Sequence, residues 1–219
     1  MEEELQAVSN CFWANQGASY PNYGTTKQRR LQELNYVMSR LKTFDSVETL
    51  IDLGCGTGST VTILQELTDI STFYCFDLSP AMLSTIDTRS LRGASVKTSV
   101  LDVSNLSTEF SFPEADLVLC FGLFQCLSDE CVIDILRRLP GNTLLARDAC
   151  YLPHEGRKDI NTFSAQLKAQ YSCRYRTLDE YMRLCSNGGW CVKDVRRSFS
   201  DDIESKFGTK QWFLHLERE

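Results

Sequence analysis

Three glycines that follow an acidic residue form the pattern in this chain that points most directly to a chemistry. Residues Val47 to Gly58 run from a short apolar stretch into Asp52 and then into alternating glycines at Gly54, Gly56 and Gly58. An apolar strand that leads through a tight turn into a helix is where α/β sheets commonly hold a nucleotide-like cofactor. We therefore expect a cofactor site at this turn.

The spacing of the glycines argues against two common cofactor motifs. A dinucleotide fingerprint requires Gly-x-Gly-x-x-Gly, but Ser59 stands where the third glycine would lie. A phosphate-binding loop requires Gly-Lys-Ser/Thr, and none follows. The segment instead resembles class I S-adenosylmethionine-dependent methyltransferases, first through Asp52, Gly54, Gly56 and Gly58.

A second acid, Asp77, ends the apolar run from Thr72 to Phe76 and lies 21 residues after Gly56. The resemblance implies that Asp77 accepts hydrogen bonds from both ribose hydroxyls, because a carboxylate offers two acceptor oxygens to two adjacent donors. The residues alone leave an alternative, in which Asp77 caps the helix that starts at Ser79.

A third acid, Asp102, follows the apolar run Val96 to Leu101. The resemblance implies that Asp102 accepts the adenine amino group beside the backbone of Val103, with Leu78 and Met82 flanking the ring. The alternative is an aspartate that caps an exposed turn.

The remaining predicted cofactor contacts surround the glycine turn. We expect Asp52 to organise the turn and to face the ammonium group of the cofactor, because a cation there needs an anionic partner. Gly54 and Gly56 allow the backbone to approach the methionine part. Cys55 and Phe121 complete the predicted set.

The segment from Ala115 to Leu127 lacks the motifs of several branches of the family. It contains no Asn/Asp-Pro-Pro-Tyr for a flipped adenine, no Pro-Cys for cytosine and no glutamate pair for arginine. An aspartate of the kind that metal-dependent catechol enzymes use is also missing. The resemblance therefore implies transfer to an O or N atom of a small molecule, with no DNA and no metal.

The acceptor site is less well marked. Tyr20, Gln125, Asp148 and Tyr151 are the predicted acceptor contacts, since the carboxyl ends of strands and the loops beyond them carry specificity. His154 and Tyr23 are the candidate catalytic groups. Two alternatives stay open: a lone loop histidine is often an ordinary surface residue, and Asp148 could be a strand-end cap.

The order of apolar runs predicts the fold. Strand and helix patterns alternate, which indicates a doubly wound α/β architecture with a mostly parallel sheet. The resemblance implies seven strands with the last one antiparallel. We expect one domain, 1–219, with a helical N-terminal cap over 1–45 and a lid insertion over 151–176. Apolar spacing predicts a helix over 27–42, and Phe163, Gln166, Leu167 and Gln170 suggest a short helix in the lid.

Composition limits the partners. A net charge of −6 argues against a surface that neutralises many phosphates, and no apolar run is long enough to span a bilayer. Ten cysteines without a Cys-x-x-Cys pair indicate buried thiols in a reducing cytoplasm.

Three rival hypotheses for the function stay open: methylation of a protein terminus or RNA, cofactor binding without catalysis, and aminopropyl transfer. The oligomeric state stays open as well.

Overall fold

The computed structural model describes residues 2–15, 27–44, 46–88, 93–151, 155–164, 169–202, 204 and 210–219. Its helices are α1 (Glu2–Ala14), α2 (Lys27–Leu41), α3 (Ser59–Leu67), α4 (Pro80–Leu83), α5 (Asp129–Arg138) and α6 (Leu178–Asn187), with the 3-10 turns η2 (Val103–Asn105) and η3 (Phe124–Cys126). Its strands are β1 (Thr49–Leu53), β2 (Thr72–Asp77), β3 (Ser95–Val100), β4 (Leu117–Phe121), β5 (Thr143–Tyr151), β6 (Lys158–Ser164), β7 (Ala169–Thr177), β8 (Trp190–Arg197) and β9 (Gln211–Arg218).

The described strands form one sheet, which confirms the predicted fold class. β3, β2, β1, β4 and β5 are parallel neighbours in that order. β9 runs antiparallel to both β5 and β8, as expected for the last strand. These seven strands match the predicted number, and the β6–β7 pair brings the sheet to nine.

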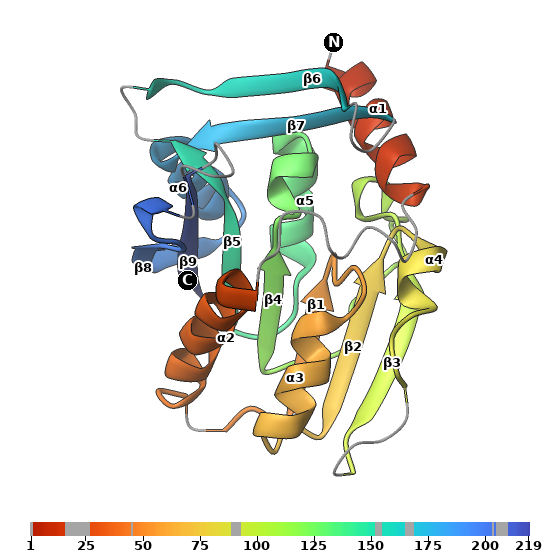
Figure 1. Ribbon diagram of the computed structural model, residues 1–219, viewed down its shortest axis with the longest axis vertical. Helices are drawn as coiled ribbons and strands as arrows, with labels where there is room; N and C mark the ends of the chain where they lie inside the picture. Colours follow the sequence, from red (N-terminus) through yellow and green to blue (C-terminus); the bar gives the residue numbers. More distant parts are fainter. Residues whose placement is uncertain are drawn as a thin grey trace.

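Two apolar layers cover the two faces of the sheet. Leu144 and Ala146 pack with residues of α5 and α6, whereas Leu145, between them, packs with residues of α2 and α3. Successive side chains of a strand point to opposite faces, so the almost continuous apolar sequence of β5 serves both layers. Figure 1 shows α2 and α3 on one side of the sheet and α5 and α6 on the other.

The helix boundaries follow the expected capping signals. Ser128 begins α5 by accepting a hydrogen bond from Cys131 N at 3.2 Å. Thr177 and Glu180 form a capping box at the start of α6. The helix predicted over 27–42 is confirmed as α2, one residue shorter.

The short helix predicted within 151–176 is wrong. This segment forms β6 and β7, which pair antiparallel so that Phe163 lies opposite Gln170. Gln166 and Leu167 lie outside the described residues. The side-chain types in β7 repeat with a period of two residues. Tyr171, Cys173 and Tyr175 alternate with Arg174 and Arg176, and this alternation is typical of a strand rather than a helix.

Two segments lie beyond the carboxyl ends of the parallel strands. Figure 1 shows α1 and the β6–β7 pair above β1, β2 and β4. α1 packs on β7, where the Phe12 ring lies 5.2 Å from the Tyr171 ring. β7 joins the sheet at the end of β5 through the pairs Cys150↔Arg176 and Tyr151↔Thr177. The carboxyl edge of the sheet is therefore where separate parts of the chain converge.

Candidate functional site

The glycine turn after β1 is tied to the end of β2. Gly54 N and Cys55 N donate to the carbonyl of Phe76 at 2.8 and 3.1 Å. Gly58 has a φ of +67°, and a Cβ there would lie 2.8 Å from the Ile86 side chain. The turn thus requires glycine for both its backbone conformation and its packing.

Asp77 lies against this turn. Its Oδ2 accepts a hydrogen bond from Gly56 N at 2.8 Å, and its Oδ1 accepts one from Ser79 N at 2.9 Å. Ser79 itself caps α4 by accepting from Met82 N at 3.3 Å. Burial raises the pKa of Asp77 above its ordinary value, against the effect of these backbone donors. The carboxylate is held in one orientation at the carboxyl edge.

Asp52 lies in the neighbouring strand and is only 4% exposed. Burial raises its pKa to about 7, and the negative charges of Asp77 and Glu33 add to the shift. A cation that entered this region would lower that pKa again and stabilise the ionised form. The Cys55 thiol has a raised pKa because of a hydrogen bond with Cys75 and burial, so it stays protonated.

Asp102 begins the turn η2 at the end of β3. Its Oδ1 accepts from Ser104 N at 2.9 Å and from Ser104 Oγ at 2.7 Å. Its Oδ2 accepts from Asn10 Nδ2 of α1 at 3.3 Å. Val103 is the first residue of η2. Leu78 directly follows β2, and Met82 is buried in α4.

The predicted acceptor residues Gln125 and Asp148 form one cluster. Asp148 Oδ1 accepts from Gln125 N at 3.1 Å, and Gln125 Oε1 accepts from Ala149 N at 3.2 Å. Asp148 is 1% exposed, shares its face of β5 with Ala146 and Cys150, and has its pKa raised to about 7 by burial. It therefore holds η3 through the backbone of Gln125.

Tyr151 lies in a group of aromatic side chains at the same edge. The centre of its ring lies 5.9 Å from that of Tyr175, and the two ring planes make an angle of 29°. Burial raises the pKa of the Tyr151, Tyr171 and Tyr175 phenols, so all three stay protonated and can donate hydrogen bonds at neutral pH. With two residues of α1 they form what we call the aromatic wall: Phe12, Trp13, Tyr151, Tyr171 and Tyr175.

The sequence did not single out the ion pair between Arg147 and Glu33. Arg147 Nε lies 3.2 Å from Glu33 Oε1 of α2, and Arg147 Nη1 donates to Gln211 Oε1. The guanidinium lies 5.8 Å from the centre of the Phe121 ring. The position of Arg147 beside Asp148 at the end of β5 indicates from the sequence that Arg147 lies near the site, but its partner Glu33 cannot be read from that position.

Three predicted residues, Tyr20, Tyr23 and His154, lie outside the described residues. Among the residues that the structure does describe, no group of three or more His, Cys, Asp or Glu side chains could hold a metal ion. Within these residues, no helix is both long and apolar enough to cross a membrane.

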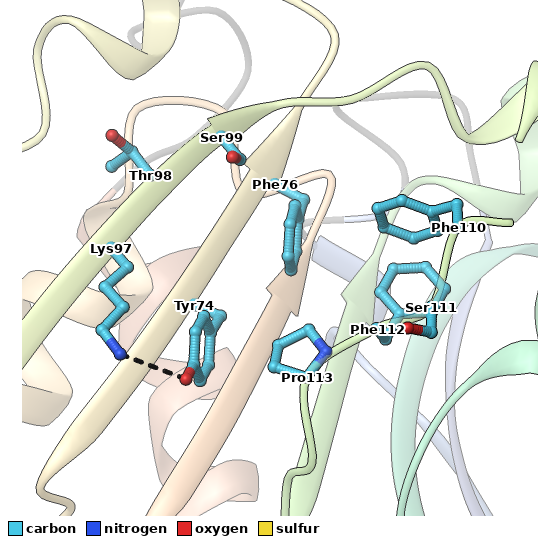
Figure 2. Close-up of a pocket in the computed structure, with 9 residues that line it drawn as sticks. All are labelled: Tyr74, Phe76, Lys97, Thr98, Ser99, Phe110, Ser111, Phe112 and Pro113. Carbon is cyan, nitrogen blue, oxygen red and sulfur yellow. Dashed lines mark hydrogen bonds between the residues drawn. The ribbon is translucent and has the colours of Figure 1, made fainter. Parts of the chain in front are cut away.

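A groove of about 430 Å³ lies elsewhere, between β2, β3 and the segment 110–113 (Figure 2). Tyr74 and Phe76 point into it from the face of β2 opposite Phe73 and Cys75, and Lys97 Nζ donates to Tyr74 Oη at 3.2 Å. None of the predicted site residues lines this groove. It is therefore separate from the carboxyl-edge site.

Comparison with known proteins connects the carboxyl-edge site to a family. Residues 51–149 match the model of a family described as a methyltransferase domain. This stretch contains the glycine turn, Asp77, Asp102 and the Gln125–Asp148 cluster. No curated protein sequence matches the chain.

Solved structures share the fold over nearly the whole chain. The N1-methyltransferase of 1,6-didemethyltoxoflavin from Burkholderia thailandensis, with its substrate and S-adenosylhomocysteine bound, has a TM-score of 0.73 at 15% identity, covering 100% of this chain and 90% of that one. A methyltransferase from Leishmania major has a TM-score of 0.69 at 15% identity, covering 97% of this chain and 82% of that one. Magnesium protoporphyrin IX methyltransferase from Synechocystis, with S-adenosylmethionine bound, has a TM-score of 0.67 at 14% identity, covering 98% of this chain and 97% of that one.

Proposed function

Because residues 51–149 match a methyltransferase domain and the chain shares its fold with S-adenosylmethionine-dependent methyltransferases, we propose that it is a class I enzyme of this kind and transfers a methyl group to an O or N atom of a small molecule. When bound, S-adenosylmethionine supplies an activated methyl group on a sulfonium. The protein then has to align the acceptor behind that methyl group and to remove a proton where the acceptor carries one.

The hydrogen bond between Gly56 N and Asp77 Oδ2 is the observation that supports this proposal best. A carboxylate offers about four acceptor lone pairs, and the backbone N–H groups of Gly56, Ser79 and Leu78 hydrogen-bond to that of Asp77. We propose that the acceptor capacity left by these donors serves the ribose hydroxyls. The glycine turn and the ribose acceptor are thus positioned by a single contact.

The other cofactor contacts follow from their places around the edge. We propose that Asp52 faces the ammonium group, since a nearby cation would offset the burial that raises its pKa. Gly54, Cys55 and Gly56 would then lie along the methionine part, with Phe121 at the end of β4. For adenine, we propose Asp102 and Val103 on one side and Leu78 and Met82 on the other.

The aromatic wall supports a small acceptor with an apolar or aromatic part. Its tyrosines can stack against such a group and donate hydrogen bonds, but their raised pKa values make them poor general bases. We therefore propose Tyr20, Gln125 and Tyr151 as acceptor contacts and keep His154 and Tyr23 as candidate catalytic groups. Asp148 acts in this proposal through η3, because it positions Gln125.

The compartment and organisation complete the proposal. All ten cysteines are free thiols, which supports a reducing cytoplasm. We propose a single domain with a cap over 1–45 and a lid over 151–176, because α1 and β7 contact each other across the carboxyl edge.

The test is release of S-adenosylhomocysteine by purified protein incubated with S-adenosylmethionine and fractionated metabolite pools. Turnover with a metabolite fraction supports the proposal. Turnover only with protein or RNA would replace it with macromolecule methylation. Binding of cofactor without turnover on any acceptor would indicate a non-catalytic protein, and release of methylthioadenosine from decarboxylated cofactor would indicate aminopropyl transfer.

A further inference from the structure

Two amide side chains of α1 connect opposite sides of the carboxyl edge. Ser128 N donates to Gln6 Oε1 at 2.7 Å. Gln6 Nε2 donates to the carbonyl of Cys126 at 3.1 Å and to Asn10 Oδ1 at 2.8 Å. Asn10 Nδ2 donates to Ser104 Oγ at 2.7 Å and to Asp102 Oδ2 at 3.3 Å. The chain of bonds runs from the segment after η3 to the acid at the end of β3, and we call it the amide relay.

The backbone at one end fixes the direction of the amide relay. A backbone N–H can only donate and a backbone carbonyl can only accept, so Ser128 and Cys126 together fix the orientation of the Gln6 amide. Gln6 Nε2 is then the atom that faces Asn10, and it requires Asn10 Oδ1 as its acceptor. Asn10 is left with its Nδ2 toward Asp102.

The helix places these two amides at the correct spacing. Gln6 and Asn10 are four residues apart in α1, so their side chains lie on one face, one turn apart. Leu5 and Phe12 are buried on the same helix and anchor it to the domain. The relay therefore depends on contacts between α1 and residues about a hundred positions later in the sequence.

At the far end of the relay, Asp102 Oδ1 accepts two hydrogen bonds and Asp102 Oδ2 accepts one. Ser104 N and Oγ both donate to Oδ1, whereas Asn10 alone donates to Oδ2. One lone pair of Oδ2 therefore remains for a donor on a ligand.

We propose that Asn10 is a positioning residue for the cofactor, and that Gln6 orients Asn10. Asn10 holds the Asp102 carboxylate so that the remaining lone pair of Oδ2 accepts a hydrogen from the 6-amino group of adenine. This inference rests on the proposed role of Asp102 as the adenine acceptor. Its consequence is selectivity for a 6-amino purine over a 6-oxo purine, because an oxygen in place of the amino group would face the fixed carboxylate.

The test compares two ligands by calorimetry: S-adenosylhomocysteine and its 6-oxo analogue, in which hypoxanthine replaces adenine. Asn10→Ala should lower the preference for adenine about five- to tenfold, the effect of one hydrogen bond. Asn10→Asp has the same shape and replaces the donor by a carboxylate, so it should lower the preference at least as much. Gln6→Ala should lower it too, and Gln6→Ala combined with Asn10→Ala should add little to Asn10→Ala.

Ala7→Gly is the matched control for the helix itself. Ala7 is exposed on α1 and takes no part in the amide relay, but a glycine at this position would weaken the helix. The adenine preference should survive Ala7→Gly. An equal loss of preference in this variant would show that docking of α1, rather than the relay, sets the selectivity, and would overturn the inference.

Asp102→Ala separates this inference from the proposed function. If Asp102→Ala lowers the adenine preference but Asn10→Ala and Asn10→Asp leave it unchanged, the relay is overturned and the role of Asp102 stands. If Asp102→Ala leaves the preference unchanged, the adenine site itself lies elsewhere and both proposals for Asp102 fail.

Discussion

Replacing Asp77 with alanine should weaken the binding of S-adenosylhomocysteine by about 30- to 1000-fold. Each ribose hydroxyl would donate to a charged acceptor, and such bonds contribute about 1.5 to 3 kcal/mol each. Two bonds to one carboxylate are not independent, so we expect a joint loss of about 2 to 4 kcal/mol. Asp77→Asn keeps one acceptor oxygen and should lose less than Asp77→Ala.

The structure also predicts a cost that has nothing to do with the ligand. Asp77→Ala removes the acceptors of Gly56 N and Ser79 N, so it should destabilise the glycine turn. Asp116 provides a matched control, because its Oδ2 accepts from Glu48 N and Thr49 N, both at 2.9 Å, near the start of β1. Asp116→Ala thus also removes an aspartate that accepts from two backbone N–H groups, at a more exposed position on the opposite edge of the sheet.

Calorimetric titration with S-adenosylhomocysteine and thermal unfolding should be measured on all four proteins. The reasoning predicts that Asp77→Ala and Asp116→Ala both melt at lower temperature, while only Asp77→Ala loses affinity. An affinity within about threefold of the wild type for Asp77→Ala would place the ribose acceptor elsewhere. A similar loss of affinity in Asp116→Ala would mean that general destabilisation explains the effect.

Three further predictions concern pH, metals and the lid. The pKa of Asp148 is about 7 in the folded protein against 3.8 for an ordinary aspartate, so the folded state binds this proton more tightly and the free energy of unfolding should fall as pH rises from about 4 to about 7. Asp148→Asn should make that fall smaller by about 2 to 3 kcal/mol between pH 5 and pH 8 in urea unfolding, and an unchanged profile would contradict the assignment. Methyl transfer should continue in EDTA, because the segment after β4 lacks the aspartate of metal-dependent members; complete loss that magnesium restores would refute this. Tyr23→Phe and His154→Gln should lower turnover or change acceptor preference at unchanged cofactor affinity and melting temperature, whereas lower melting with full turnover per folded molecule would make both residues structural.

The cofactor site could be predicted because the sequence patterns that indicate it each lie within one short stretch of the chain. Residues 47–58 contain a strand, a turn and a helix start in one uninterrupted stretch. The spacing of 21 residues between Gly56 and Asp77 then anticipates a contact that the structure contains. Parallel neighbours such as β1 and β2 bring their carboxyl ends together whatever the details of packing.

The segment 151–176, which we propose to face the acceptor, depends on contacts that cannot be read from the sequence. Arg174 and Arg176 have no exposed surface, although arginine usually indicates an exposed position. Arg176 is buried because it donates to the carbonyls of Phe124 and Leu127 and to Asp129, about fifty residues away. Such partners cannot be read from the spacing within β7, so the strand was mistaken for part of a helix-containing lid.

Asp148 illustrates a different limit. Alternation along β5 indicates that Asp148 shares a face with Ala146 and Cys150, but it does not tell which face meets the helices and which meets the ligand. The same holds for Gln6 and Asn10, whose partners in η2 and near η3 lie 92 to 122 residues away. Only the packed structure brings these residues together.

The forked pairing of β5 has a consequence for how such a protein can diversify. β9 pairs with β5 from Thr143 to Ala149, and β7 takes over for Cys150 and Tyr151 alone. The β6–β7 segment is therefore attached to the sheet by two residue pairs, while the glycine turn and Asp77 belong to strands that it does not touch through the sheet. Because β6 pairs with β7 alone among the described strands, substitutions on β6 can change this outer surface without altering the pairing of the strands that carry the glycine turn and Asp77, so the two parts of the sheet can diversify at different rates.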